Sequence, residues 1–383
     1  MKVMKDMNVE KNKKMSIYVH IPFCKQKCKY CDFISFNSNE ETKEKYVNSL
    51  LDEINCTKFK GYTVNTIYIG GGTPSYILSE NIIKILNEIR LQYIIEDNAE
   101  ITIEINPGTI NKEKLRDYKN AGINRLSIGL QSTNNRLLSL IGRIHTYEEF
   151  LETYKLAEEI GFDNINVDLI LGLPTQTKDE LTQSLDKVIK LSPNHISIYS
   201  LILEENTKLK EMVCKKEVEL IDDELERDMY WTAKKKLEEN QYIHYEISNF
   251  AKGGHFSKHN LIYWNQEEYI GFGLNAHSYI DNRRFSNTSD LEKYINNSQD
   301  NIEIHEDQTK EEKAKEYMML GLRKIDGVSI SDFENKFRLN PLFYFRFEIS
   351  DLTEKGLIEV DLDNIKLTNK GLDFANRVFE KFV

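Results

Sequence analysis

SIYVHIPFCKQKCKYCDFISF, residues 16–36, carries three of the chain's five cysteines within eight positions. Cys24, Cys28 and Cys31 are spaced C-x3-C-x2-C. Clustered thiolates are natural ligands for soft metal centres, and a [4Fe-4S] cube needs one ligand for each of its four irons. Three thiolates would leave one iron open to a small chelating molecule. Two alternatives are three unrelated thiols and a zinc site completed by a histidine such as His20, although zinc sites usually pair one C-x2-4-C with a second, distant pair.

Short β-branched runs alternate with amphipathic helical patterns from this stretch to about residue 200. The predicted strands are residues 17–20, 66–69, 101–105, 125–129, 164–169 and 195–200. Helical patterns between them include residues 41–54, 79–91, 147–160 and 178–191. Successive βα units of this kind imply a parallel sheet with right-handed crossovers. Periodicity leaves open whether that sheet is flat or curled into part of a barrel.

The second half of the chain has a different pattern. Residues 216–240 are predicted as a long charged helix, and residues 242–285 as aromatic, glycine-punctuated strands and loops. A charged hinge near residues 296–313 precedes helices and then two short strands around a turn, which favours a small winged-helix-like unit. Because its local charge is mixed, we expect no nucleic-acid binding there.

Composition describes an ordinary soluble protein of 383 residues, 40% hydrophobic and 30% charged. The net charge of −11 argues against a general nucleic-acid binder. No apolar run approaches a membrane span, and the first 14 residues lack a signal-peptide core, so they are predicted to be a disordered tail. Five cysteines in so long a chain form no disulfide framework, which favours a reducing, cytoplasmic setting.

Glycines and polar residues stand where the predicted strands end. Residues 70–74, GGGTP, follow the second strand, and glycine lets the backbone approach a ligand closely. Glu104, Gln131 and Asp168 stand at the ends of later strands, and Arg143 lies twelve residues after Gln131. Each has an ordinary alternative, because a strand-end carboxylate often caps a helix and an arginine often forms a surface ion pair.

The cysteine spacing, with Tyr30 before the third cysteine, resembles the signature of radical S-adenosylmethionine (SAM) proteins. In that family SAM chelates the fourth iron through its amine and carboxylate, and an electron from the cluster cleaves it to a 5'-deoxyadenosyl radical. YVHIPFC, GGGTPS, EINPG, GLQS, DLILGLP and KHNLIYWN are similar to the anaerobic coproporphyrinogen oxidase family, and within it to the haem-chaperone branch. The resemblance runs from residue 15 to the C-terminus. It implies an α/β fold, a partial (β/α)6 barrel, with a C-terminal winged-helix-like cover.

The resemblance also implies cofactor roles for individual residues. Cys24, Cys28 and Cys31 would hold the cluster. The residues implied to bind SAM are Tyr18, Gly71, Gly72, Thr73, Glu104, Gln131, Arg143 and Asp168. Arg143 offers a planar fork suited to the SAM carboxylate, and Asp168 would accept hydrogen bonds from the ribose hydroxyls. Glu104 and Gln131 would orient the aminoacyl and ribose portions, and Tyr18 would reach the cluster-bound end.

The chain departs from dedicated coproporphyrinogen oxidases, which carry a fourth cysteine where this chain has Asp32-Phe33 after Cys31. Such oxidases also have an N-terminal extension that helps hold a second SAM, and here only a short polar tail precedes the cysteine loop. Both departures argue against decarboxylation of coproporphyrinogen.

Residues 258–264, KHNLIYW, match the HNxxYW motif of haem chaperones. His259 would ligate haem iron, with Tyr263 and Trp264 packing on the porphyrin. The alternative is a histidine bonded inside a core, beside aromatics that simply pack there. Nearby, Asn275 is predicted to be left-handed, and His277 is a second candidate ligand.

We therefore expect a haem chaperone that holds a SAM-coordinated [4Fe-4S] cluster, binds haem and passes it to unidentified acceptor proteins. The alternatives are a radical SAM oxidoreductase acting on coproporphyrinogen III or another tetrapyrrole, and a haem-degrading methyltransferase. Enzymatic activity, a homodimer and transient membrane contact are left open. The expected parts are the tail (1–14), the barrel (15–240), a segment with the haem motif (241–300) and the cover (301–383).

Overall fold

The computed structural model describes residues 13–57, 59, 61–296 and 302–383. Most of the predicted N-terminal tail, residues 1–12, lies outside this range, and Lys13 already begins the first strand. No helix in the part of the chain described is both long and apolar enough to cross a membrane.

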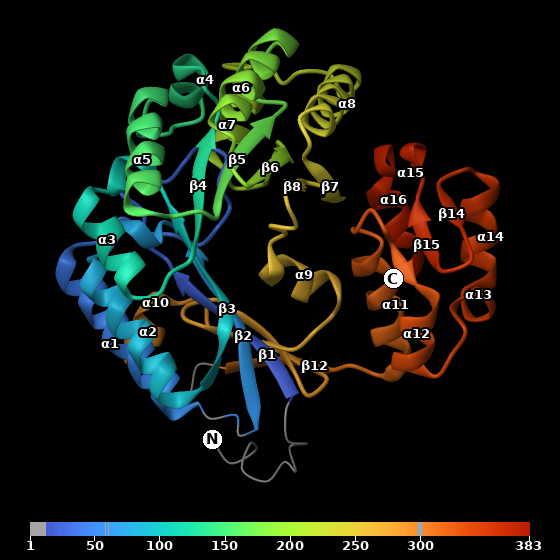
Figure 1. Cartoon of the computed structure of the whole chain (residues 1–383), viewed down its shortest axis with the longest axis horizontal. Helices are drawn as coiled ribbons and strands as arrows, with labels where there is room; N and C mark the ends of the chain where they lie inside the picture. Colours follow the sequence, from blue (N-terminus) through green and yellow to red (C-terminus); the bar gives the residue numbers. More distant parts are fainter. Residues whose placement is uncertain (1–12, 58, 60, 297–301) are drawn as a thin grey trace.

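Six parallel strands form the centre of a twelve-stranded sheet, each joined to the next through helical segments (Figure 1). The strands are β1 (Lys13–Ile21), β2 (Tyr62–Gly71), β3 (Ile94–Ile105), β4 (Arg125–Gln131), β5 (Ile165–Leu171) and β6 (His195–Ser200). The helices are α1 (Glu40–Cys56), α2 (Ser79–Gln92), α3 (Lys112–Asn120), α4 (Asn135–Leu140), α5 (Tyr147–Ile160) and α6 (Lys178–Leu191). The predicted strands, and the curled sheet implied by the family resemblance, are confirmed.

Further strands extend the sheet at both edges. β7 (Ile243–Glu246) and β8 (Asn249–Ala251) follow β6, and β8 is antiparallel to it. On the other side β9 (Tyr269–Phe272) runs parallel to β1, followed by the antiparallel β10 (His277–Ile280), β11 (Arg283–Asn287) and β12 (Ile302–Asp307). The helix α10 (Leu291–Asn296) packs against α1. The predicted segment 241–300 thus contributes strands to the same sheet as the barrel.

Two predicted elements differ in the structure. The charged helix expected over 216–240 is α8 (Asp223–Glu239), preceded by the separate α7 (Lys208–Cys214). Lys216 has a φ of 57°, a left-handed conformation that interrupts the predicted helix. The helix α8 begins later, where the side chain of Asp222 caps it by accepting a hydrogen bond from the Leu225 amide. The expectation of only strands and loops over 242–285 is also wrong, because this region contains the helix α9 (Lys258–Trp264).

The C-terminal unit has its own sheet and core. Its elements are α11 (Lys310–Gly321), β13 (Val328–Ser329), α12 (Ile330–Phe337), α13 (Pro341–Tyr344), α14 (Arg346–Glu354), β14 (Ile358–Val360), β15 (Asn364–Leu367), α15 (Asn369–Asp373) and α16 (Ala375–Phe379). The strands form an antiparallel sheet in the order β13-β15-β14. Met318, Phe333 and Ile365 are fully buried in a core separate from that of the barrel. This arrangement confirms the winged-helix-like extension.

The two faces of the barrel sheet differ in chemistry. On β1, Ile17 and Val19 pack into the apolar core between sheet and helices. The alternate residues point to the concave face, where the Tyr18 ring lies beside that of Tyr68 and the Thr66 hydroxyl bonds Ser16. Because successive side chains of a strand point to opposite faces of the sheet, the same strand contributes to both the apolar core and the concave face. The barrel interior is therefore polar, and suited to a polar ligand.

Candidate cofactor site

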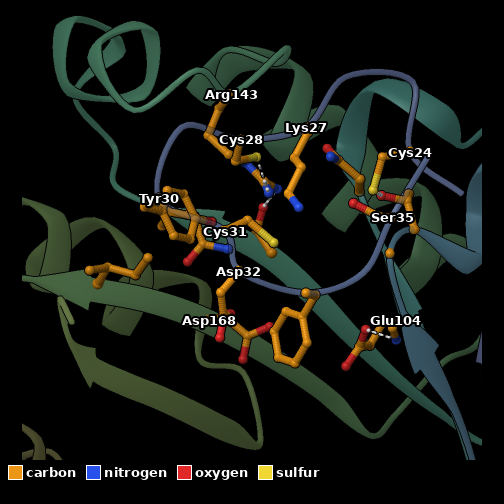
Figure 2. A pocket seen from close by; sticks show the side chains of 18 of the residues that line it. Cys24, Lys27, Cys28, Tyr30, Cys31, Asp32, Ser35, Glu104, Arg143 and Asp168 are labelled. Atoms are coloured by element: carbon orange, nitrogen blue, oxygen red, sulfur yellow. Dashed lines mark hydrogen bonds between the residues drawn. The ribbon is translucent and has the colours of Figure 1, made fainter. Parts of the chain in front are cut away.

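One cavity of about 560 Å³ opens at the carboxyl ends of the parallel strands, where such barrels place their functional residues (Figure 2). It brings together most of the residues predicted for the cluster and for SAM. Those lining it are Cys24, Cys28, Cys31, Gly71, Gly72, Thr73, Glu104, Gln131, Arg143 and Asp168. Figure 2 shows the cysteines on one side of the cavity and the Glu104 and Asp168 carboxylates on the other.

The cysteine loop follows β1 and is held at several points. The Cys24 amide donates to the Phe36 carbonyl at 3.0 Å, and the Lys29 amide donates to the Ile141 carbonyl at 2.9 Å. The Cys24 sulfur lies 3.3 Å from Thr73 Oγ1. Burial raises the pKa of the Cys24 thiol and raises that of Cys31 to about 11. These thiols favour the neutral form in the protein alone, and a bound metal centre is what would convert them to thiolates.

No group of three or more His, Cys, Asp or Glu side chains in the part of the chain described converges as the ligands of one metal ion do. A [4Fe-4S] cube makes a different demand, since each thiolate binds a separate iron. Arg143 lies at the edge of the cysteine loop, with Nη1 at 3.6 Å from Cys28 Sγ and Nη2 donating to the Gly129 carbonyl at 2.6 Å. Its buried Nε has no partner. The donor set fits a cluster whose open iron carries an anionic chelator beside Arg143.

The glycine loop packs directly against the cysteine loop. Gly71 has a φ of +110°, and a Cβ there would lie 2.6 Å from the His20 ring. A Cβ on Gly72 would lie 3.0 Å from the Phe23 backbone and 3.1 Å from Cys24 Sγ. The Thr73 amide donates to the Phe23 carbonyl at 2.9 Å. Glycine is needed here for close approach between the two loops, as well as for the approach of a ligand.

Two half-buried carboxylates form the floor of the cavity. Glu104 accepts hydrogen bonds from the Tyr68 hydroxyl at 2.8 Å and from the Gly71 amide at 3.1 Å. Asp168 accepts from Ser127 Oγ at 3.1 Å and Asn166 Nδ2 at 2.8 Å. Burial raises the pKa of Glu104 to about 7 and also raises that of Asp168. Carboxylates in such a cavity attract a ligand that brings an ammonium group and hydroxyls, as SAM does.

Gln131 ends β4 in an unusual backbone conformation. Its φ is 71°, and the register between β4 and β5 shifts between Gly129 and Gln131. A residue other than glycine in this region costs roughly 1–3 kcal/mol, and such strain clusters at functional sites. The bend places Gln131 on the cavity wall beside Gly129 and Arg143.

Tyr18 is the one residue predicted to bind SAM that does not line the cavity. Its hydroxyl lies 3.0 Å from His20 Nδ1, so its contact with SAM stays a prediction. Tyr68, Ser127, Tyr199 and Ile202 line the cavity and were missed by the sequence analysis. Tyr68 could have been found, because it lies two residues before Gly70 and so faces the same side of β2.

His259 lies away from this cavity and is only 1% exposed. Its Nδ1 is 2.7 Å from Thr66 Oγ1, its Nε2 is 2.9 Å from the Tyr263 hydroxyl, and its ring stacks on Tyr68 with centroids 5.1 Å apart. Both ring nitrogens therefore have protein partners. The structure favours the alternative of a histidine bonded inside a core, and ligation of haem iron by His259 stays a prediction for a state in which α9 has opened.

The helix α9 also joins the barrel to the C-terminal unit (Figure 1). On the barrel side, Glu100 accepts hydrogen bonds from the amides of Lys258 and His259. On the other side, the Arg323 guanidinium lies 4.5 Å from the Trp264 ring centroid, and Lys336 Nζ donates to the carbonyls of Asn265 and Gln266. Tyr263 and Trp264 thus pack within the protein.

The prediction for Asn275 is confirmed, since its φ is 55°. His277 begins β10 with an exposed side chain. Neither residue lines the cavity.

The open parallel barrel, the three-cysteine loop after β1 and the acidic floor are those of a radical SAM protein. Residues 18–188 match the Radical SAM superfamily, and residues 308–374 match the HemN C-terminal domain. The structure of coproporphyrinogen III oxidase (HemN) from Escherichia coli has the same fold, with a TM-score of 0.84 at 24% identity over 96% of this chain and 89% of that one.

Curated relatives narrow the class further. The heme chaperone HemW of Bacillus subtilis is 39% identical over 374 residues, covering 96% of this chain and 99% of that protein. The heme chaperone HemW of Lactococcus lactis is 36% identical over 369 residues, covering 96% of this chain and 97% of that protein. The chain belongs to the HemW family.

Proposed function

We propose that this protein is a haem chaperone, which holds a SAM-coordinated [4Fe-4S] cluster, binds haem and passes it to acceptor proteins. Its membership of the HemW family carries this proposal. The sequence after Cys31 supports it, because Asp32-Phe33 provides no fourth cysteine of the kind found in dedicated oxidases.

The cavity residues have distinct parts in holding the cofactors. When bound, the cluster supplies a redox-active iron centre with one position for the amino-acid end of SAM. Cys24, Cys28 and Cys31 would hold the cluster, and Arg143 would pair with the SAM carboxylate. Glu104 would accept from the ammonium group and Asp168 from the ribose. Gly71, Gly72, Thr73 and Gln131 would shape the walls around them.

A second candidate function is a radical SAM oxidoreductase acting on coproporphyrinogen III or another tetrapyrrole. It is supported by the cavity, which gathers every residue predicted to bind SAM except Tyr18. Anaerobic incubation with SAM, a reductant and coproporphyrinogen III would then yield protoporphyrinogen and 5'-deoxyadenosine. Family membership favours the chaperone, for which we expect neither product.

The setting and partners follow from the same reasoning. We propose a cytoplasmic location, where reduced thiols persist. The haem acceptors are unidentified, and a homodimer and transient membrane contact stay predictions.

Anaerobic haem titration of the cluster-reconstituted protein tests the proposal. We expect one haem per chain, a shifted Soret band and little 5'-deoxyadenosine on addition of SAM and reductant. Failure of the protein to take up stoichiometric haem would contradict the chaperone function. Parallel titration of His259→Ala tests the separate prediction that His259 ligates haem iron.

A further inference from the structure

The mouth of the cofactor cavity carries apolar side chains that are left in water. Phe33 is 60% exposed, Ile202 is 67% exposed and Tyr199 is 41% exposed, and all three line the same cavity. Phe33 belongs to the cysteine loop, whereas Tyr199 and Ile202 lie at the end of β6 and just after it. Apolar side chains gathered at the rim of a polar cavity mark a site for an apolar ligand.

The mouth differs from α9 in access. His259 is enclosed between Thr66, Tyr68 and Tyr263, so a haem can reach it only after α9 has moved. The mouth residues need no movement to be reached. In the structure as it stands, the mouth is the better candidate for contact with a haem.

Charged groups around the mouth suit a ligand that is flat and apolar with anionic edges. Lys27 also lines the cavity, and Figure 2 shows its side chain beside Cys28 and Arg143. Asp32 and Glu204 also line the cavity, so an anionic edge would avoid their side and turn to Lys27. Haem has this chemistry, with two porphyrin faces and two propionates at one edge.

We propose that haem docks across the mouth of the cofactor cavity, with its porphyrin face on Phe33, Tyr199 and Ile202 and its propionates toward Lys27. This inference rests on the proposed chaperone function. No histidine or methionine is among the residues that line the cavity. Haem there is held through its faces and edges, and its iron stays available to the axial ligand of an acceptor protein.

A haem in this position covers the opening through which SAM enters. The floor residues Glu104 and Asp168 lie beneath the haem, so SAM that is bound to them dissociates only after the haem has dissociated. Haem therefore slows the release of SAM without competing for its residues.

Titration of the full-length, cluster-reconstituted protein with haem and with iron-free protoporphyrin IX tests the inference. Because the mouth binds porphyrin faces, we expect both compounds to bind. Ile202→Ser and Phe33→Ser should each weaken binding by about tenfold, the effect of losing one large apolar contact. Phe343→Ser is the matched control, since Phe343 is 72% exposed on α13 in the C-terminal unit.

A second measurement is the rate at which labelled SAM leaves the protein with and without haem, which we expect haem to lower several-fold. Phe33 is two residues from Cys31, so the cluster spectrum of its variant must match wild type. If it does not, Ile202→Ser alone carries the test. Unchanged binding in Ile202→Ser, or an unchanged rate of SAM release, would overturn the mouth site while leaving the chaperone function intact. Absence of haem binding by wild type would instead defeat the proposed function itself.

Discussion

The hydroxyl of Tyr68 donates a 2.8 Å hydrogen bond to Glu104 Oε1, on the floor of the cofactor cavity. The same tyrosine ring stacks on His259, with centroids 5.1 Å apart, at the other side of the barrel interior. Tyr68 therefore links the cavity to the buried His259 of α9 through one side chain. Its hydrogen bond also lowers the pKa of Glu104, against the larger raising effect of burial.

We predict that Tyr68→Phe shifts the pH dependence of SAM binding. Burial raises the pKa of Glu104 to about 7, so its anionic form, which attracts the SAM ammonium, gains population as pH rises through that value. Loss of the Tyr68 hydrogen bond moves the midpoint to higher pH and weakens binding near neutral pH about fivefold to tenfold. SAM affinity measured across about pH 6 to 9, from one unit below the wild-type midpoint to two units above it, checks this. Tyr62→Phe is the control on the same strand, and an identical midpoint in Tyr68→Phe would count against the prediction.

We predict that Cys28→Ser abolishes cluster assembly, because a cube held by two thiolates loses a covalent ligand to one iron. Iron and sulfide content and the visible absorption of the reconstituted protein measure the effect. Cys214→Ser, which changes an exposed cysteine on α7, should assemble the cluster as wild type does. Equal iron content in the two variants would remove Cys28 from the site.

We predict that Lys336→Met loosens α9 from the C-terminal unit. Lys336 Nζ donates to the carbonyls of Asn265 at 3.1 Å and Gln266 at 2.9 Å, and its loss leaves both without a charged donor. The expected cost is about 1–3 kcal/mol in the free energy of unfolding. Hydrogen exchange should quicken at residues 258–266. The control is Lys355→Met, which removes an exposed ion pair with Asp351. It should change the free energy of unfolding by no more than about 0.5 kcal/mol, and the hydrogen exchange of residues 258–266 should match wild type.

We predict that Glu53→Gln changes how stability depends on pH. Glu53 is buried beneath the sheet, where it accepts from the Gly273 amide, Asn287 Nδ2 and the Tyr294 hydroxyl. Burial raises its pKa to about 7. The folded protein then keeps a proton that the unfolded chain releases above its pKa of about 4.3. The stability contributed by the protonated carboxyl is complete below that value and is lost as pH rises through about 7.

The Glu53→Gln variant has a neutral amide in place of this carboxyl, and so it has no proton to lose in this pH range. Relative to wild type, its free energy of unfolding should therefore improve between about pH 5 and 8, by up to about 3 kcal/mol. Urea unfolding at several pH values measures the difference. Glu41→Gln, at an exposed residue of the same helix, should show no such trend. A constant difference between Glu53→Gln and wild type would contradict the assignment.

Much of the barrel could be predicted from the sequence. The parallel strands are short β-branched runs separated by helical patterns, and this pattern depends only on local periodicity. The cavity residues could be predicted because the carboxyl ends of parallel strands meet at one edge. The helix α9 was missed because it has only seven residues, which is too few to show a helical periodicity in the sequence. Its start also depends on the Ser257 cap.

The sequence by itself determined the family and the residue types that are available to bind a ligand, since the cysteine spacing and the strand-end polar residues are local features. Only the tertiary structure decided which side chains can be reached. His259 belongs to the KHNLIYW motif and Phe33 to the cysteine loop. Packing of α9 between the barrel and the C-terminal unit buries His259, whereas Phe33 stays 60% exposed at the cavity mouth. Exposure depends on contacts between segments distant in the chain, and no local pattern of residues encodes it.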